Sequence, residues 1–316
     1  MGSQKVLQHA RHIAAALCAG MLVSSTPALA AHPSAAASPL QTLRAPLEWE
    51  AGPQPGTRRA VARLGGRTVA VVTETTRGAA ATTVRSERIS AAGFGGPATD
   101  SVITFDGTSV TETDLPLGTL ARSDGSTQAG APCPRNVTCG RLAYRWTRCF
   151  QVDDGYSYAY QCFHVYSAGT TSKTLAYRAG WWTGTANSDA GSNLRSVLDR
   201  DDMTDCTPCG VRVDEWSPSG DIYPPGSGKT VSLGFGLSGA GVNANIAESL
   251  TVYSQVYGPL AGYPKPGEFR FLWRGNTGSG TSIGMAGGDE WQYRRASGYP
   301  WFLSITNTVC YPSWLC

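Results

Sequence analysis

Residues 228–257, GKTVSLGFGLSGAGVNANIAESLTVYSQVY, alternate apolar with small or polar side chains. The apolar residues occupy odd positions from 231 to 237 and even positions from 242 to 256. A period of two is typical of a β-strand, because successive side chains leave opposite faces. The glycines around Ala240 permit positive φ, so a tight reversal fits there. The stretch therefore predicts two long antiparallel strands with one apolar face.

Other segments carry the same signal and extend it to the whole chain. Residues 60–64 and 67–75 flank Gly65 and Gly66, which is typical of a β-hairpin with a two-residue turn. Short strands are also expected at 84–89, 102–105, 269–273 and 301–305. The sequence predicts an all-β protein, built as an antiparallel β-sandwich or as twisted sheets with long loops. A disulfide-stabilised C-terminal domain is expected to follow a smaller β-rich N-terminal segment.

The N-terminus has the features of an export signal. Lys5 and Arg11 precede a short apolar run at 13–23, and Ala28-Leu29-Ala30 forms a cleavage motif of small residues. We expect residues 1–30 to be a signal peptide and the mature protein to be secreted. Removing two cations and no acid lowers the net charge from +3 to 3 − 2 = +1. This balance gives no reason to expect a nucleic-acid partner.

Composition divides the remaining chain into three parts. Residues 31–46 are rich in Ala, Ser and Pro and are predicted to be a disordered leader. Residues 47–130 contain no cysteine and predict a small β-rich region that ends in a Gly/Ser-rich linker. Residues 131–316 are predicted to be a disulfide-bonded β domain. Removal of the N-terminal region after export is the alternative to a stable N-terminal lobe.

Eight cysteines follow the linker, and an even number in an exported chain indicates a disulfide framework. They are Cys133, Cys139, Cys149, Cys162, Cys206, Cys209, Cys310 and Cys316. A hairpin centred on Asp153-Asp154-Gly155 would place Cys149 and Cys162 opposite each other, within bonding reach. Cys206 and Cys209 have the spacing of a redox motif, but β and loop surroundings favour a structural disulfide.

Aromatic residues in the middle of the chain suggest a ligand-binding face. Tyr156, Tyr158 and Tyr160 share one face of a predicted strand, and Trp181 and Trp182 follow. Such a row can stack on sugar rings. Aromatic residues also favour strands for packing alone, so a core role is the alternative.

One acidic stretch suggests a cation site. Asp199, Asp201, Asp202 and Asp205 lie close together, and alternating oxygen ligands suit calcium. The glycine and the terminal glutamate of an EF-hand are missing, so a solvated acidic loop is the alternative. No other cofactor is expected.

Catalytic motifs are few. His164 is the only histidine after the leader, and the chain has no nucleophile elbow around a serine. A secreted hydrolase would have to use His164 or carboxylates. The carboxylates considered are Asp153, Asp154, Glu248, Asp289 and Glu290. Adjacent acids on a strand point to opposite faces, so a neighbouring pair is not itself a catalytic site.

The sequence therefore favours a non-enzymatic protein of the bacterial extracellular space that binds a glycan or a protein through an aromatic face. One alternative is an oligomeric pore-forming protein in which residues 229–257 enter a membrane as a hairpin, because the strand length and alternation fit. The other alternative is the secreted hydrolase. In composition the chain resembles exported proteins of high-GC actinobacteria, and this likeness transfers no functional residue.

Overall fold

The computed structural model describes residues 41–64, 67–76, 78–89, 99–122, 137–138, 143–168, 175–202, 210–217, 229–236, 245–252, 256–259, 267–294 and 300–315. The fold is all-β, as the sequence predicts, with two eight-stranded sheets and one three-stranded sheet in these residues. A short helix, α1 (Thr119–Arg122), and a 3-10 turn, η2 (Ser313–Leu315), accompany the strands. All strand pairs of the described residues are antiparallel except β6 with β9.

The first eight-stranded sheet is sheet A. In spatial order it contains β1 (Thr42–Pro46), β7 (Ser109–Pro116), β6 (Thr99–Phe105), β9 (Ala143–Asp153), β10 (Ser157–Ala168), β11 (Leu175–Ser188), β18 (Ile283–Arg294) and β13 (Arg212–Ser217).

The second eight-stranded sheet is sheet B. In spatial order it contains β16 (Val256–Pro259), β17 (Glu268–Gly278), β12 (Asn193–Asp202), β19 (Pro300–Cys310), β5 (Ala79–Ile89), β4 (Arg67–Thr76), β3 (Thr57–Leu64) and β2 (Glu50–Ala51). The small sheet contains β14 (Lys229–Gly236), β15 (Asn245–Val252) and β8 (Val137–Thr138).

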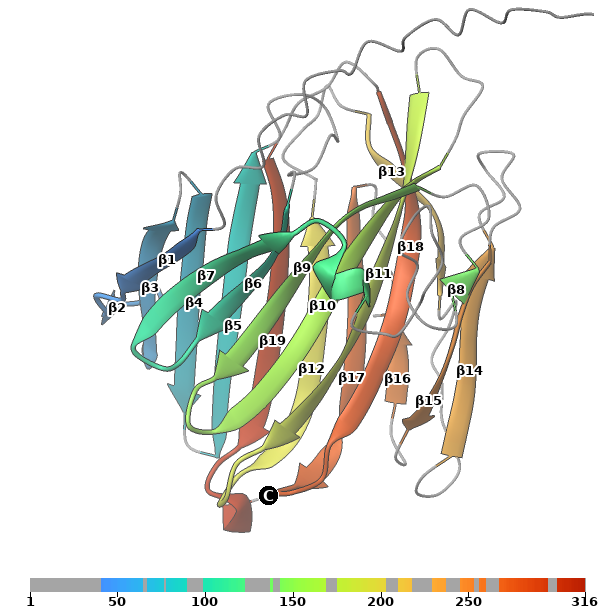
Figure 1. Ribbon diagram of the computed structural model, residues 1–316. Coiled ribbons are helices and arrows are strands. Elements are labelled where there is room, and N and C mark those ends of the chain that lie inside the picture. Colours follow the sequence, from blue (N-terminus) through green and yellow to red (C-terminus); the bar gives the residue numbers. More distant parts are fainter. Residues whose placement is uncertain are drawn as a thin grey trace, which may run out of the picture. The chain divides into compact units, whose positions relative to one another are not determined.

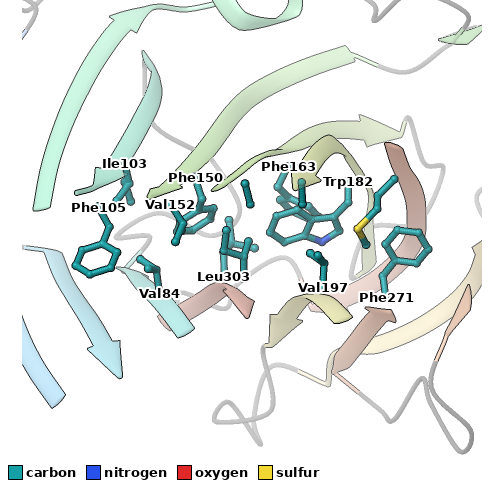
Figure 2. Packing of buried hydrophobic residues seen from close by; sticks show 14 of the residues in the cluster. Val84, Ile103, Phe105, Phe150, Val152, Phe163, Trp182, Val197, Phe271 and Leu303 are labelled. Carbon is teal, nitrogen blue, oxygen red and sulfur yellow. The ribbon is translucent and has the colours of Figure 1, made fainter. Parts of the chain in front are cut away.

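Sheets A and B form two layers with the core between them (Figure 1). The alternation seen in the sequence explains this: Ala60, Ala62 and Leu64 of β3 are buried and their neighbours on the strand are exposed. Figure 2 shows Phe150, Phe163 and Trp182 of sheet A pointing toward Val197 and Leu303 of sheet B. Burying each of these large side chains contributes roughly 1.5–3 kcal/mol.

Polar contacts also join the two layers. The Arg148 guanidinium of β9 donates to Ser86 Oγ of β5 at 2.5 Å and forms an ion pair with Glu112 at 3.2 Å. Asn307 Nδ2 of β19 donates to Ser157 Oγ of β10 at 3.1 Å. The inner face of the sandwich is therefore a mixed apolar and polar layer.

The predicted hairpins are confirmed in their backbone register. Lys229 pairs with Val252 and Gly236 with Asn245 in the antiparallel β14–β15 ladder, and the residues between the two strands lie outside the described chain. Leu64 pairs with Arg67, the register expected of the predicted β3–β4 hairpin, and Gly65 and Gly66 themselves lie outside the described residues. The strands expected at 84–89, 102–105, 269–273 and 301–305 lie within β5, β6, β17 and β19.

The structure does not divide at the domain boundary predicted near residue 130. Strand β5 pairs with β19 and strand β6 with β9, so strands from both sides of residue 130 build both large sheets. Residues 40–316 form one compact unit. Residues 42–46, which composition places in a disordered leader, form β1 and pair with β7. The predicted signal peptide and linker lie outside the described residues.

The Cys149–Cys162 disulfide is present, and the two residues are directly opposite in the β9–β10 register. This confirms the pairing predicted from the hairpin geometry. Cys310 is disulfide-bonded as well. The other five predicted disulfide cysteines, Cys133, Cys139, Cys206, Cys209 and Cys316, lie outside the described residues. In the part of the chain that is described, no helix has the length and apolar character needed to cross a membrane.

Candidate binding surface

The two tryptophans predicted to bind a ligand do not reach the surface. Trp182 is opposite Phe163 and faces the core, whereas Trp181 is opposite His164 on the outer face of sheet A. Both side chains are 0% exposed. Their place in the predicted aromatic face is therefore wrong: adjacent strand residues point to opposite sides, and both rings serve packing.

The three tyrosines also separate. Tyr158 and Tyr160 lie on the outer face of β10 and are half-buried. Tyr156 precedes the strand, where its ring packs edge-on against Tyr311 with 5.0 Å between centroids. Of the five predicted residues, Tyr156 alone thus belongs to an aromatic group at the end of the sandwich.

That group includes aromatic residues of the C-terminal segment. Tyr311 is 43% exposed and Trp314 is 79% exposed, the largest exposed fraction among the exposed large hydrophobic residues of the described chain. The Ser313 amide donates to the Gly191 carbonyl at 2.7 Å, which ties η2 to the β11–β12 turn. We call Tyr156, Tyr311 and Trp314 the end-face aromatics. The sequence signal for Trp314 is its position between Cys310 and Cys316.

Carboxylates lie in the turns beside these rings. Asp154 Oδ1 accepts hydrogen bonds from the amides of Tyr156 and Ser157 at 2.9 and 2.7 Å, which shapes the β9–β10 turn. The Asp189 amide donates to the Tyr156 carbonyl at 2.9 Å. Partial burial raises the pKa of Asp189, and the negative charges of Asp153 and Asp154 raise it further. The end face therefore carries a local negative potential.

The acidic stretch predicted to hold calcium has a different geometry. Residues 193–202 form β12, so the predicted acidic loop is wrong up to Asp202. Asp199 and Asp201 face the core, and Asp202 faces the other side of sheet B, where Arg200 binds it. Asp205 lies outside the described residues. The described part of the chain contains no group of three or more His, Cys, Asp or Glu side chains that fits a metal ion.

The carboxylates considered for catalysis are also dispersed. Asp289 faces the core and Glu290 the outer side of sheet A, as expected for neighbours on a strand, and both are fully buried. Asp153 is the last residue of β9, and Asp154 follows it in the β9–β10 turn. Glu248 is part of β15, opposite Leu233. These carboxylates therefore belong to separate regions of the molecule.

His164 has partners that sequence reasoning missed. Its Nδ1 lies 2.8 Å from Thr147 Oγ1 and its Nε2 lies 3.1 Å from Thr183 Oγ1. The Tyr144 hydroxyl lies 2.7 Å from Thr147 Oγ1 and 2.5 Å from Asp100 Oδ1. We call these five residues the His164 network. It crosses β6, β9, β10 and β11, and strand neighbours from four segments are not visible in a sequence.

Burial sets the charge in this network. Loss of hydration lowers the pKa of His164 to about 4, so the ring is neutral at physiological pH. Burial also raises the pKa of Asp100, although hydrogen bonds from Tyr144, Thr147 and Leu120 lower it. A base this weak and this enclosed suits a structural role better than proton transfer.

Comparison with known proteins adds no relative: no protein-family model matches the chain, and no match is found among curated proteins.

Proposed function

We propose that this protein is a secreted, non-enzymatic binding protein that holds an extracellular glycan at its end-face aromatics. The observation that carries the proposal is the exposure of Trp314, 79%, three residues after a second exposed aromatic residue, Tyr311. Exposed aromatic residues that are anchored from below are typical of binding surfaces, because they bury large area at low entropic cost.

The anchoring is specific. Tyr156 supports Tyr311 from one side, and the Ser313–Gly191 hydrogen bond fixes the backbone before Trp314. Asp153 ends β9 and Asp189 follows β11, and the two carboxylates are close enough to interact. Flat rings stack on sugar faces and carboxylates accept hydrogen bonds from sugar hydroxyls, so the two groups together suit a carbohydrate.

A binding experiment with the mature chain, residues 31–316, tests the proposal. Glycan arrays and cell-wall pull-downs identify the ligand, and titration then compares wild type with Trp314→Ala and Tyr311→Ala. We expect each substitution to weaken binding about tenfold or more, as for aromatic hot spots.

Leu117→Ala is the matched control, because Leu117 is also an exposed apolar residue, 47%, and follows β7 in the chain. Equal affinity of wild type and Trp314→Ala, or an equal loss in Leu117→Ala, would refute the end face as the binding site.

The β14–β15 register favours a second candidate function, insertion of this hairpin into a membrane as part of an oligomeric pore. The pairs Val231–Leu250 and Phe235–Ile246 put apolar positions of both strands on one face, while Ser232–Ser249 and Gly234–Ala247 share the other. Glu248 is a charged position on the apolar face, opposite Leu233. Dye release from liposomes tests this candidate: release that increases in Glu248→Gln supports it, and intact liposomes with both proteins refute it.

A further inference from the structure

Two carboxyl groups face each other between the two sheets, and a third is buried two residues away on the same strand face. Asp199 and Asp201 are on the inner face of β12, and Asp289 is on the inner face of β18 in the opposite layer. All three are 0% exposed. Asp201 Oδ2 and Asp289 Oδ1 have no donor among the described residues, and the two carboxyl groups interact with each other across the layers. We call these residues the carboxyl cluster.

Donors reach two members of the cluster. The Phe269 amide donates to Asp201 Oδ1 at 3.1 Å, and Trp291 Nε1 donates to Asp289 Oδ2. Neither oxygen of Asp199 has a hydrogen-bond partner in the described chain. Unpartnered buried polar atoms are rare and destabilising, so their presence indicates a protonation-dependent or functional role.

One cation of the described residues shares this inner layer: Arg178 of β11 is buried opposite Trp291, and its guanidinium lies over the Tyr293 ring, 5.5 Å from the centroid. The register places mainly uncharged side chains around Asp199, Asp201 and Asp289 on the strands that pack against them. They are Phe269 and Phe271 of β17, Leu303, Ile305 and Asn307 of β19, Gly180 and Trp182 of β11, and Met285, Gly287 and Trp291 of β18. Arg200 and Arg270 bind Asp202 and Glu268 on the other face of sheet B. Asp201 and Asp289 are the titratable groups of this set that interact with each other.

We propose that the carboxyl cluster is a proton-dependent clamp between the two sheets, closed while its carboxyls hold protons and weakened as they ionise. Two carboxyls can share a hydrogen bond only if one of them carries a proton. Ionisation of both would set two negative charges against each other in a buried, largely apolar layer. A proton held between the Asp201 and Asp289 carboxyls thus links sheet B to sheet A.

Burial acts in the same direction, since it raises the pKa of all three carboxyls well above the usual range. Below the unfolded-chain pKa of about 3.9, folded and unfolded states both hold these protons. Above it, the unfolded chain releases them and the folded state retains them. The cluster therefore lowers the thermal midpoint progressively as the pH rises from about 4 toward the folded-state pKa values.

The experiment measures the thermal midpoint of the mature protein from pH 5 to pH 9, with Asp199→Asn and Asp201→Asn beside wild type. These amides keep the shape and remove the ionisable group. We expect each variant to melt roughly 2–4 °C or more above wild type at pH 8. The advantage should shrink at pH 5. Infrared spectroscopy should show a protonated-carboxyl band at pH 7 in wild type that decreases in both variants.

Asp202→Asn is the matched control, since this buried acid adjoins Asp201 on the same strand but faces Arg200 at 2.5 Å. Neutralising it should lower the midpoint at pH 8, because it leaves Arg200 with fewer partners. The clamp is refuted if the Asp199 and Asp201 variants melt below wild type at pH 8. It is also refuted if wild type lacks the protonated band at pH 7, a readout that does not depend on the variants folding.

Discussion

Sheet A buries polar side chains on both faces, and the two sets differ in how their hydrogen bonds are satisfied. On the outer face, both nitrogens of His164 have hydroxyl partners, and Asp100 accepts from Tyr144 and from two backbone amides. On the inner face, Asp289 joins a carboxyl cluster in which Asp199 has no hydrogen-bond partner in the described residues. Burial alone therefore does not decide whether a polar residue stabilises the fold; the number of its partners does.

The largest effect is expected from Asp100→Ala. This change removes the acceptor for the Thr147 and Leu120 amides and for the Tyr144 hydroxyl. Several buried donors would then lack partners, so we expect a loss of about 3–5 kcal/mol in the free energy of unfolding. Urea denaturation followed by tryptophan fluorescence measures it. A loss below about 1 kcal/mol would show that the His164 network does not stabilise sheet A.

Acid should unfold the protein through His164. Its folded pKa of about 4 lies below the unfolded value of about 6.5, so the unfolded chain binds the proton first. The stabilising contribution is complete above pH 6.5 and disappears as the pH falls to 4, amounting to roughly 3 kcal/mol. His164→Gln, which cannot titrate, should flatten this part of the stability curve. An unchanged slope between pH 6.5 and pH 4 in the variant would contradict the assignment.

A substitution in the carboxyl cluster should stabilise the protein, whereas Asp100→Ala in the His164 network should destabilise it. Asp199→Val places a β-branched apolar side chain between Phe271 and Ile305, its partners in the register. We expect the free energy of unfolding at pH 8 to rise by about 1–3 kcal/mol, because a buried polar group without a partner is removed. Thr147→Val is the isosteric counterpart in the His164 network and should destabilise. If both substitutions shift stability in the same direction, the contrast between the two faces fails.

The smallest effect is expected at the surface. Arg59 and Glu50 form an exposed ion pair, 3.1 Å between Arg59 Nε and Glu50 Oε1. Arg59→Ala should change the free energy of unfolding by less than about 0.5 kcal/mol. Chemical denaturation at low and high salt checks this value and sets the baseline for the buried substitutions. A change above about 1 kcal/mol would mean that polar partners matter equally at every depth.

The parts of the fold that were predictable are local in sequence. The β14–β15 and β3–β4 pairings and the Cys149–Cys162 disulfide involve segments that are close in sequence, where periodicity and turn chemistry determine the register. All-β architecture follows from the same alternation.

The binding and titrating groups were less predictable, because they depend on pairing between distant strands. The acidic stretch that begins at Asp199 has the composition of a loop, and only its position between β17 and β19 makes part of it a buried strand. Trp314 is one of many aromatic residues in the sequence, and only η2 exposes it. His164 looks isolated in the sequence because Thr147 and Thr183 are contributed by neighbouring strands. Tertiary context overrides local composition at each of these positions.

The central position of β19 in sheet B has a consequence for folding order. This strand follows the other strands of both large sheets in the sequence, yet it pairs with β12 on one side and with β5 on the other. In the described part of the chain, β19 is therefore the strand that joins β2–β5 to the rest of sheet B, and it is synthesised last. Pairing between strands about 220 residues apart, such as Thr83 with Thr306, carries a high loop-closure cost and predicts slow folding. A nascent chain halted before residue 300 would hold open sheet edges, the state in which β-proteins are most vulnerable to aggregation.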